Sequence, residues 1–346
     1  MRSLPSADID LILEHTGEVW RKLDDARIFL TGGTGFFGCW LVESFLWAVE
    51  RTGIDATITV LTRSPRKFVE KAPHLALHHA VRVVEGDVRF FSLPHDRFTH
   101  VIHAAADATP ALCREQPLLV LDTIVDGTRR VLDFAENAGA RRVLFTSSGA
   151  VYGRQPATLS HIPEDYAGAP APSHPEAVYA EGKRAAETLC AVYGRTHGLE
   201  CVIARCFAFA GPLLPLDSHF AIGNFIRDAV AGGPIRIQGD GTAVRSYLYA
   251  ADLTAWLWTM LVNGAPGRVY NAGSEEPYSI EEIARAVGGA VEIAQRPAPG
   301  STPQRYVPST QRARSELNLA QWTPLHEAIR RTAEWAAPPI LNGDRA

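Results

Sequence analysis

The sequence predicts an α/β fold in which a doubly wound parallel sheet is followed by a smaller α/β domain. Three observations predict it. An apolar, β-prone run over 26–31 passes through a glycine turn into an apolar run over 39–46, which is long enough for a buried helix. β-Branched segments and helical patterns then alternate as far as about residue 205. Beyond that point the alternation weakens, which indicates a second, smaller region.

Composition and charge exclude several classes of protein. The chain has 346 residues, a 46% hydrophobic share and a formal net charge of −4, which is unlike a protein that coats nucleic acid or a membrane surface. Acidic residues interrupt 1–25, so no signal peptide is expected, and the apolar run at 255–262 is too short to span a bilayer. We therefore expect a cytoplasmic protein with no nucleic-acid or membrane partner.

The five cysteines are scattered, odd in number and without the spacing of a zinc site. Most of them lie in apolar runs, so we expect buried free thiols in a reducing compartment and no bound metal. They are Cys39, Cys113, Cys190, Cys201 and Cys206.

The glycine turn is the first candidate binding site. Its glycines fall three residues apart, and glycine permits a tight turn, close approach of backbone to a pyrophosphate, and close packing of helix on strand. The N-terminus of the following helix offers N–H groups and a partial positive charge to phosphates. We expect a dinucleotide there, held by Gly32, Gly35, Phe36, Phe37 and Gly38.

The whole stretch 31–38, Thr-Gly-Gly-Thr-Gly-Phe-Phe-Gly, resembles the extended branch of the short-chain dehydrogenase/reductase superfamily. The resemblance extends over about residues 26–335. It implies a Rossmann-type fold, an NAD(P) cofactor and a nucleotide-activated sugar as substrate.

The second strand, predicted at 56–61, ends in a turn that decides the cofactor. An acidic residue at this place holds the ribose 2′-hydroxyl of NAD, whereas arginine accommodates the 2′-phosphate of NADP. The turn at 62–67 has three cations and no carboxylate, and Arg63, next to Ser64, can form a bidentate contact with a phosphate. We expect NADP(H), with NAD(H) as the alternative. A solvated basic turn is the explanation that needs no ligand.

The third predicted strand, at 81–88, ends in Gly-Asp-Val and is similar to the superfamily's G-D-[VI] element. The resemblance implies that Asp87 reaches the adenine edge, with Val88 beside it. A bare Gly-Asp is also a common turn.

The fourth predicted strand, at 99–107, is similar to the superfamily's V-[IF]-H-x-A-A. The resemblance implies that Ala104 and Ala105 lie against the cofactor, and we assign Asp107 to the substrate. His103 is a conceivable base, but a packed strand histidine is favoured.

A helical pattern over 116–138 leads to a fifth strand at 142–145. This strand runs into 146–153, Thr-Ser-Ser-Gly-Ala-Val-Tyr-Gly, which is similar to the superfamily's S-S-x-x-V-Y-G. The resemblance implies that the hydroxyl of Ser148 is catalytic and contacts the substrate. A serine after a strand is otherwise a turn former.

Tyr179 and Lys183 are four residues apart, so on a helix over 177–187 they share one face. A tyrosine titrates near 10, and a nearby ammonium lowers that pKa. We therefore expect Tyr179 to exchange a proton with a sugar hydroxyl during hydride transfer, and both side chains to contact the cofactor. An exposed Tyr–Lys pair is the structural alternative.

The segment 205–212 resembles R-x-F-N-x-Y-G-P with two departures: Ala208 replaces an Asn that touches the nucleotide diphosphate, and Ala210 replaces a Tyr. Asn224 is a candidate for the missing substrate contact, although a helix cap is an equal alternative. Arg245 matches an arginine that binds substrate phosphates in the superfamily, and a planar cation suits a diphosphate.

The reaction type follows from two missing side chains. The resemblance implies that dehydratases carry an Asp-Glu pair directly after the catalytic hydroxyl. It also implies that UDP-glucuronate decarboxylases carry a Glu one place further on. This chain has Gly149 and Ala150 at these positions. The remaining chemistry is hydride transfer at sugar C4. We favour a 4-ketoreductase, with a 4-epimerase as the alternative, and a dehydratase, a reductase of a non-sugar substrate or a non-catalytic binding protein as less favoured possibilities.

We expect a helical extension at 1–25, a Rossmann domain at 26–205, and a mainly substrate-binding domain at 206–337 with some segments returning to the core. A tail follows at 338–346. The resemblance also implies a homodimer in which the helices near 116–138 and 179–193 form a four-helix bundle.

Overall fold

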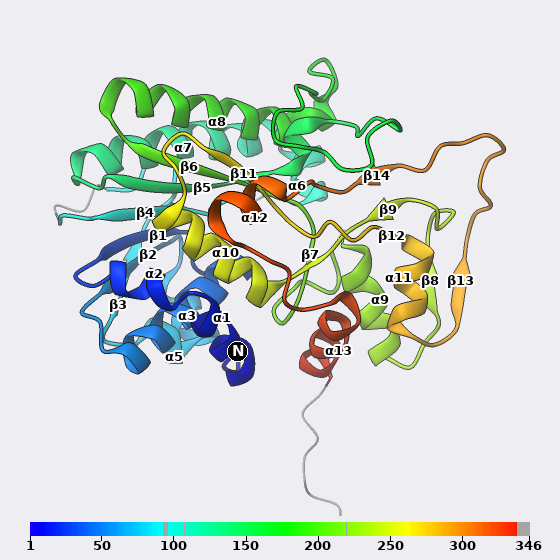
Figure 1. Ribbon diagram of the computed structural model, residues 1–346, viewed down its shortest axis with the longest axis horizontal. Coiled ribbons are helices and arrows are strands. Elements are labelled where there is room, and N and C mark those ends of the chain that lie inside the picture. The colour runs from blue at the N-terminus through cyan, green and yellow to red at the C-terminus, as the bar shows by residue number, and fades with distance from the viewer. Residues whose placement is uncertain (93–95, 107, 219, 338–346) are drawn as a thin grey trace, which may run out of the picture.

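A parallel sheet forms the centre of the computed structural model, which describes residues 1–92, 96–106, 108–218 and 220–337 (Figure 1). Within these residues the sheet has seven strands in the order β11-β6-β5-β4-β1-β2-β3. The strands are β1 (Arg27–Thr31), β2 (Thr57–Thr62), β3 (Val81–Glu85), β4 (His100–His103), β5 (Arg142–Ser148), β6 (Glu200–Cys206) and β11 (Val269–Ala272).

These segments form strands because they are apolar runs that can be buried on both faces. Ile28, Phe29 and Leu30 of β1 have no exposed surface, as parallel strands between two layers of helices require. β1 pairs with β2 on one side and β4 on the other, all in parallel register. From β1 the strand order runs to β2 and β3 on one side, and from β4 it runs to β5 and β6 on the other, so it reverses between the neighbours β1 and β4. Doubly wound sheets bind their ligands at such a point. The predicted fold class is confirmed.

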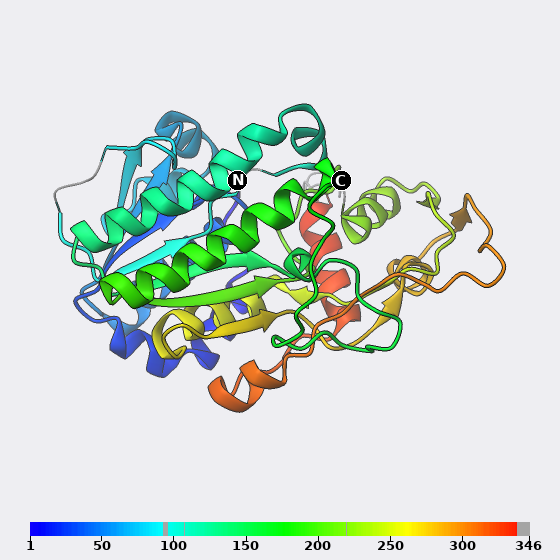
Figure 2. The same cartoon turned by 90° about the horizontal axis from the view of Figure 1, so that it is seen from above.

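Helices cover both faces of the sheet. α7 and α8 lie side by side on one face (Figure 2), and α3 and α10 pack on the other. α7 contributes Val131 and Leu132 to the core under it, and most of α10 is buried. The helices associated with the sheet are α3 (Phe36–Thr52), α4 (Pro65–Lys71), α5 (Pro73–Ala76), α6 (Pro110–Glu115), α7 (Pro117–Asn137), α8 (Val178–His197), α10 (Ala250–Asn263) and α12 (Gln311–Leu317), with the 3-10 turns η1 (Gly149–Tyr152) and η2 (Pro175–Ala177).

The N-terminal extension forms two helices, α1 (Ser6–His15) and α2 (Gly17–Lys22). Trp20 anchors the extension, because its ring packs 4.9 Å from that of Trp258 on α10 and its indole N–H donates to Thr16 Oγ1 over 2.7 Å. Asp8 is buried between Tyr249, which donates a 2.7 Å hydrogen bond, and Arg331. The extension is thus fastened to the sheet region and to the C-terminal helix.

A smaller group of short elements lies at one end of the sheet (Figure 1). Its core joins apolar side chains of α9, α11 and α13. β8 pairs with β13, β10 with β7, and β12, β9 and β14 form a small sheet. The bounds are β7 (Phe209–Ala210), α9 (Ala221–Val230), β8 (Ile235–Ile237), β9 (Val244–Arg245), β10 (Leu248–Tyr249), β12 (Tyr278–Ser279), α11 (Ile280–Val287), β13 (Val291–Ile293), β14 (Arg305–Tyr306) and α13 (Leu325–Ala336).

Asp252 joins α10 to the segment that precedes α13. α10 begins at Ala250, so Asp252 lies inside the helix, where its carboxylate accepts the N–H groups of Trp322 and Thr323 and the hydroxyl of Thr323 at 2.8–2.9 Å. Burial raises its pKa to about 6. The carboxylate therefore holds the segment before α13 against α10.

All five cysteines are free thiols, as predicted, and four of them are buried, Cys113 being partly exposed. No helix in the described part of the chain combines the length and the apolar character that crossing a membrane requires.

Candidate functional site

The glycine loop between β1 and α3 is shaped by backbone contacts that leave no room for side chains. Gly32 has a φ of +75°, and a Cβ at that position would lie 2.6 Å from the carbonyl carbon of Ala104. A Cβ on Gly38 would overlap the carbonyl oxygen of Gly32. These two glycines therefore allow the loop to approach β4 and α3 to start directly behind it.

The N-terminus of α3 faces out of this loop at Gly35. No side chain in the described residues caps this N-terminus, where Phe36 and Phe37 are the first helical residues. Lys71 holds the loop from α4 by donating a 2.7 Å hydrogen bond to the carbonyl oxygen of Thr34. An uncapped helix N-terminus behind a glycine loop fits the pyrophosphate of a dinucleotide.

The ends of β2 and β3 bring a group of charged side chains together. Ser64 caps α4, and its hydroxyl accepts the N–H of Lys67 over 3.4 Å. Asp87 is held by Arg89 in a bidentate pair at 2.9 and 3.0 Å. The hydrogen bonds of Arg89 keep the pKa of Asp87 below its usual range, and the charge of Arg63 adds to this effect. Arg63, Ser64 and Asp87 thus lie at one edge of the sheet.

His103 on β4 is a packed strand histidine, as the sequence favoured. Its Nδ1 lies 2.8 Å from Thr31 Oγ1 and its Nε2 lies 3.0 Å from Thr128 Oγ1. Burial lowers its pKa to about 3, so the ring is neutral. The backbone of Ala104 lies against Gly32, while Asp107 falls outside the described residues.

Ser148, Tyr179 and Lys183 come together where β5 ends under the start of α8. Ser148 Oγ accepts the N–H of Ala150 over 3.1 Å at the start of η1, and it lies close enough to the hydroxyl of Tyr179 to lower the pKa of that group. Lys183 is buried and its ammonium donates to the carbonyl oxygen of Thr146 over 2.7 Å. The residues matched by the resemblance therefore share one site.

The predicted direction of the tyrosine pKa is wrong for this structure. Burial raises the pKa of Tyr179 to about 12, and the neighbouring Ser148 offsets this rise only in part. Burial also lowers the pKa of Lys183 to about 8. Helical spacing places the two side chains on one face, but it says nothing of their desolvation, which dominates here.

A buried polar network lies behind this site. Ser147 donates to Glu187 Oε1 over 2.5 Å, and Glu187 forms two hydrogen bonds of 2.7 and 3.0 Å with Arg205. The guanidinium of Arg205 also lies 4.6 Å from the ring centroid of Tyr152. The network fixes β5, α8 and β6 relative to one another, and with them Ser148 and Tyr179.

Tyr306 is a residue of this site that the sequence analysis missed. It comes from β14; burial raises the pKa of its hydroxyl, and the neighbouring Ser148 opposes that rise. Its ring lies 4.6 Å from that of Phe207. β14 is two residues long within an irregular segment, so no periodic pattern marks it in the sequence.

The two proposed substrate residues lie in the smaller region. Arg245 on β9 donates to its neighbour's carbonyl oxygen over 2.9 Å. Asn224 lies inside α9, whose N-cap is Phe220, so it is not a helix cap. Its amide donates to Ser218 over 2.9 Å and accepts from Arg227 at 3.2 Å.

Glu164, in the loop at 156–175, carries a carboxylate that is already hydrogen-bonded. It accepts the N–H of Asn271 over 2.9 Å and lies 3.9 Å from Arg312. Burial raises its pKa. These contacts give the carboxylate a structural role in joining the 156–175 loop to β11.

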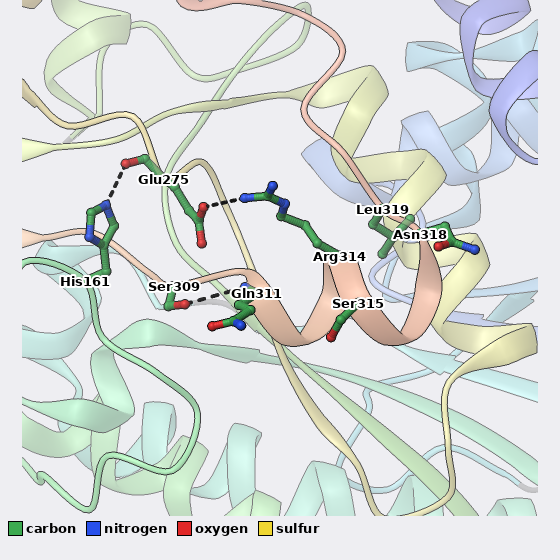
Figure 3. A pocket seen from close by; sticks show the side chains of 8 residues that line it. All are labelled: His161, Glu275, Ser309, Gln311, Arg314, Ser315, Asn318 and Leu319. Atoms are coloured by element: carbon green, nitrogen blue, oxygen red, sulfur yellow. Dashed lines mark hydrogen bonds and ion pairs between the residues drawn. The ribbon is translucent and has the colours of Figure 1, made fainter.

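A surface cavity of about 710 Å³ lies elsewhere, between α12 and the 156–175 loop (Figure 3). Glu275 pairs with Arg314 across it at 2.9 Å, and His161 bonds to the carbonyl oxygen of Glu275 at 2.9 Å. Its lining contains none of Ser148, Tyr179 or Lys183. This cavity is therefore separate from the candidate catalytic site.

A doubly wound parallel sheet with a glycine loop between its first strand and helix defines a Rossmann-type dinucleotide-binding protein. The model of the NAD dependent epimerase/dehydratase family matches residues 28–273. The chain belongs to this family of extended short-chain dehydrogenase/reductase enzymes.

Curated relatives and solved structures agree with this assignment. UDP-glucuronic acid decarboxylase 1 of Xenopus tropicalis is 30% identical over 317 residues, which cover 90% of this chain and 72% of the relative. The enzyme of the same name from Arabidopsis thaliana is 31% identical over 324 residues, covering 92% and 71%.

Among solved structures, the UDP-glucose 4-epimerase of Thermus thermophilus in complex with NAD is 26% identical, with a TM-score of 0.73 and coverage of 89% of this chain and 98% of that one. DesIV, a dTDP-glucose 4,6-dehydratase from Streptomyces venezuelae, has a TM-score of 0.75 at 24% identity over 89% and 96% of the two chains. The second likeness shows the fold alone.

Proposed function

We propose that the protein is an NADP(H)-dependent reductase of a 4-keto sugar carried on a nucleotide diphosphate. The observation that carries the proposal is the site at the end of β5. Ser148, Tyr179 and Lys183 gather there, and Gly149 and Ala150 follow Ser148 without supplying an acid or a base. Such a site suits hydride transfer and not the elimination of water.

The protonation states favour reduction over oxidation. A tyrosine with a pKa of about 12 keeps its proton at neutral pH, so Tyr179 can donate it to the oxygen that forms at C4. Lys183, with a pKa of about 8, is largely charged at that pH and stabilises the negative charge left behind. The reduced nicotinamide supplies the hydride when it is bound.

The choice of NADP(H) rests on the edge formed by β2 and β3. The 62–67 turn carries no carboxylate to hold a ribose 2′-hydroxyl, and Asp87 is paired with Arg89. Arg63 and the capped start of α4 at Ser64 follow β2 directly, where the adenosine ribose of a dinucleotide lies in this fold. A 2′-phosphate would be attracted by this basic turn.

The substrate class is supported by Arg245 and by the activities of similar proteins, which act on UDP-glucuronic acid and UDP-glucose. Arg245 lies on β9 in register with Tyr306, which reaches Ser148. A cation in this position suits a diphosphate attached to the reacting sugar.

A 4-epimerase is the second candidate. The Thermus thermophilus UDP-glucose 4-epimerase is similar over 98% of its length, and epimerisation at C4 needs the same three side chains. A decarboxylase is disfavoured, although several similar proteins are decarboxylases. Ala150 occupies the position at which the resemblance implies a glutamate in those enzymes. Glu164 does not replace it, because its carboxylate is hydrogen-bonded to the N–H of Asn271.

We further propose a homodimer formed through α7 and α8. Leu118 on α7 has 73% of its surface exposed and Val192 on α8 has 43%. Val131 and Leu132, which are also on α7, are buried in the core beneath the helix. Exposed apolar side chains on two neighbouring helices suit pairing with a second copy across a two-fold axis.

Thermal shift with a panel of nucleotide sugars, followed by NADPH consumption, tests the proposed function. A true ligand stabilises the folded protein by mass action. We expect stabilisation by UDP- or dTDP-linked sugars and NADPH oxidation only with a 4-keto sugar nucleotide. Interconversion of UDP-glucose and UDP-galactose without net NADPH oxidation would favour the epimerase, and release of CO₂ from UDP-glucuronate would favour the decarboxylase.

A further inference from the structure

Tyr306 is carried to the catalytic site by a rigid piece of the smaller region. In β14 it lies in parallel register with Arg245 of β9. The next residue, Val307, is fully buried, and its backbone is bonded on both sides: its N–H donates to Gln155 Oε1 and its carbonyl oxygen accepts from Ile162, each over 2.9 Å. The backbone that bears Tyr306 is therefore fixed against the 156–175 loop.

The phenol of Tyr306 occupies the space beside the residue that follows Ser148. Its hydroxyl lies 2.6 Å from the point where a Cβ on Gly149 would stand, and the ring of Phe207 lies 2.7 Å from the same point. Gly149 is thus required by its neighbours, although its φ is ordinary. An acidic side chain at position 149 and the observed position of Tyr306 exclude each other.

Ser148 can make three hydrogen bonds, one as donor and two as acceptor. It accepts from the N–H of Ala150 over 3.1 Å, and its neighbours include the hydroxyls of Tyr306 and Tyr179, whose pKa values it lowers. Tyr179 must direct its own proton at the substrate, so it can only accept from Ser148. The second acceptor position of Ser148 is then left for the proton of Tyr306.

We propose that Tyr306 is a positioning residue for the hydride transfer, which it supports by donating its hydroxyl proton to Ser148. This hydrogen bond directs the proton of Ser148 toward the oxygen of Tyr179, and so directs the proton of Tyr179 toward the substrate. Tyr306 itself exchanges no proton with the substrate. The inference rests on the proposed function and deepens it, because it names the group that orders the hydroxyls of the same site.

The reductive step balances with these groups in place. A bound reduced nicotinamide would supply the hydride for the new C4–H bond, losing a C–H bond of its own and becoming oxidised, while the electron pair of the carbonyl would move to its oxygen. That oxygen takes the proton of Tyr179, whose O–H bond breaks. The phenolate that remains accepts the hydrogen bond from Ser148, which Tyr306 holds in the required direction.

The first test compares Tyr306→Phe with Tyr278→Phe, using NADPH and dTDP-4-keto-6-deoxyglucose. Tyr278 is the matched control, because it also lies opposite Arg245 but its hydroxyl bonds to Glu276 over 3.0 Å. We expect Tyr306→Phe to lower kcat about tenfold at nearly unchanged KM, as the loss of one hydrogen bond would. Tyr278→Phe should match the parent.

A double-mutant cycle separates this role from a structural one. Because Tyr306 acts through Ser148, Ser148→Ala and Ser148→Ala/Tyr306→Phe should have the same kcat. Additive losses, a change confined to KM, or full activity of Tyr306→Phe would overturn the proposal. Equal melting temperatures of the variants would exclude unfolding as the cause.

Crystal structures of the parent and of Tyr306→Phe provide a readout that needs no substrate. We expect Ser148 Oγ to lie within hydrogen-bond distance of both tyrosines in the parent and to turn away from Tyr179 in the variant. An unchanged Ser148 would contradict the positioning role. If the parent reduces no 4-keto sugar nucleotide, but Ser148 still turns away from Tyr179 in Tyr306→Phe, the proposed function alone is refuted.

Discussion

The ammonium of Lys183 donates a 2.7 Å hydrogen bond to the carbonyl oxygen of Thr146, two residues before Ser148 on β5. This bond ties the first turns of α8 to the end of β5. Tyr179, one turn earlier on α8, is thereby held against Ser148. The same buried ammonium lies 4.7 Å from the ring centroid of Phe145, an aromatic neighbour that helps to exclude water from the charge.

Tyr179→Phe removes the proton donor and keeps the ring. We expect turnover to fall by roughly 10²–10⁴-fold, the usual contribution of general acid–base catalysis. NADPH binding and the melting temperature should be retained, since the hydroxyl is the only group removed. Turnover close to that of the parent would mean that another residue is the proton donor.

The rate of reduction should fall as pH rises through about 8. Burial lowers the pKa of Lys183 to about 8, so its charge is present below that pH and lost above it, while Tyr179 keeps its proton until about 12. Lys183→Arg keeps a charge throughout this range and should flatten the decline. A parent rate that stays constant above that pH would contradict the assignment of Lys183.

Arg63→Asp should reverse the preference for the cofactor. A carboxylate repels the 2′-phosphate of NADP and can hold the 2′-hydroxyl of NAD. Arg66→Asp is the matched control, because Arg66 lies three residues later in the first turn of α4 and pairs with Glu70 at 2.7 Å. Titration of both cofactors measures the effect, and equal affinities in the parent would refute the NADP(H) proposal.

Leu118→Arg and Val192→Arg should convert the proposed dimer into a monomer, because each places a charge in the helix pair that we assign to the interface. Leu77→Arg is the control, since Leu77 is 69% exposed but lies after α5, away from α7 and α8. Light scattering at micromolar concentration distinguishes these states. A monomeric parent would contradict the assembly.

Local patterns predict the parallel sheet and the meeting of Ser148, Tyr179 and Lys183. β1 is an apolar run of continuous burial, and the four-residue spacing of Tyr179 and Lys183 fixes their common helix face. Contacts between segments that lie far apart in the chain cannot be predicted in this way. Asp252 bonds to Thr323, a partner 71 residues away, which no local pattern reveals.

The sequence also did not predict the desolvation of Tyr179 or the position of Tyr306 beside Ser148. The pKa of Tyr179 depends on how much of the surrounding chain excludes water, which spacing does not encode. Tyr306 reaches Ser148 from a strand of two residues, far later in the chain, and only the folded structure brings them together. Both limits concern long-range packing.

Mass analysis of the product formed with C4-deuterated NADPH distinguishes reduction at sugar C4 from the loss of water or CO₂. With a 4-keto sugar nucleotide, the account predicts a product that has gained one deuterium at sugar C4 and one proton on the C4 oxygen. With intact nucleotide-hexoses or UDP-glucuronate it predicts no loss of water or CO₂, because Gly149 and Ala150 offer no acid or base. Loss of either from these substrates, without deuterium transfer to a 4-keto sugar, would contradict the account.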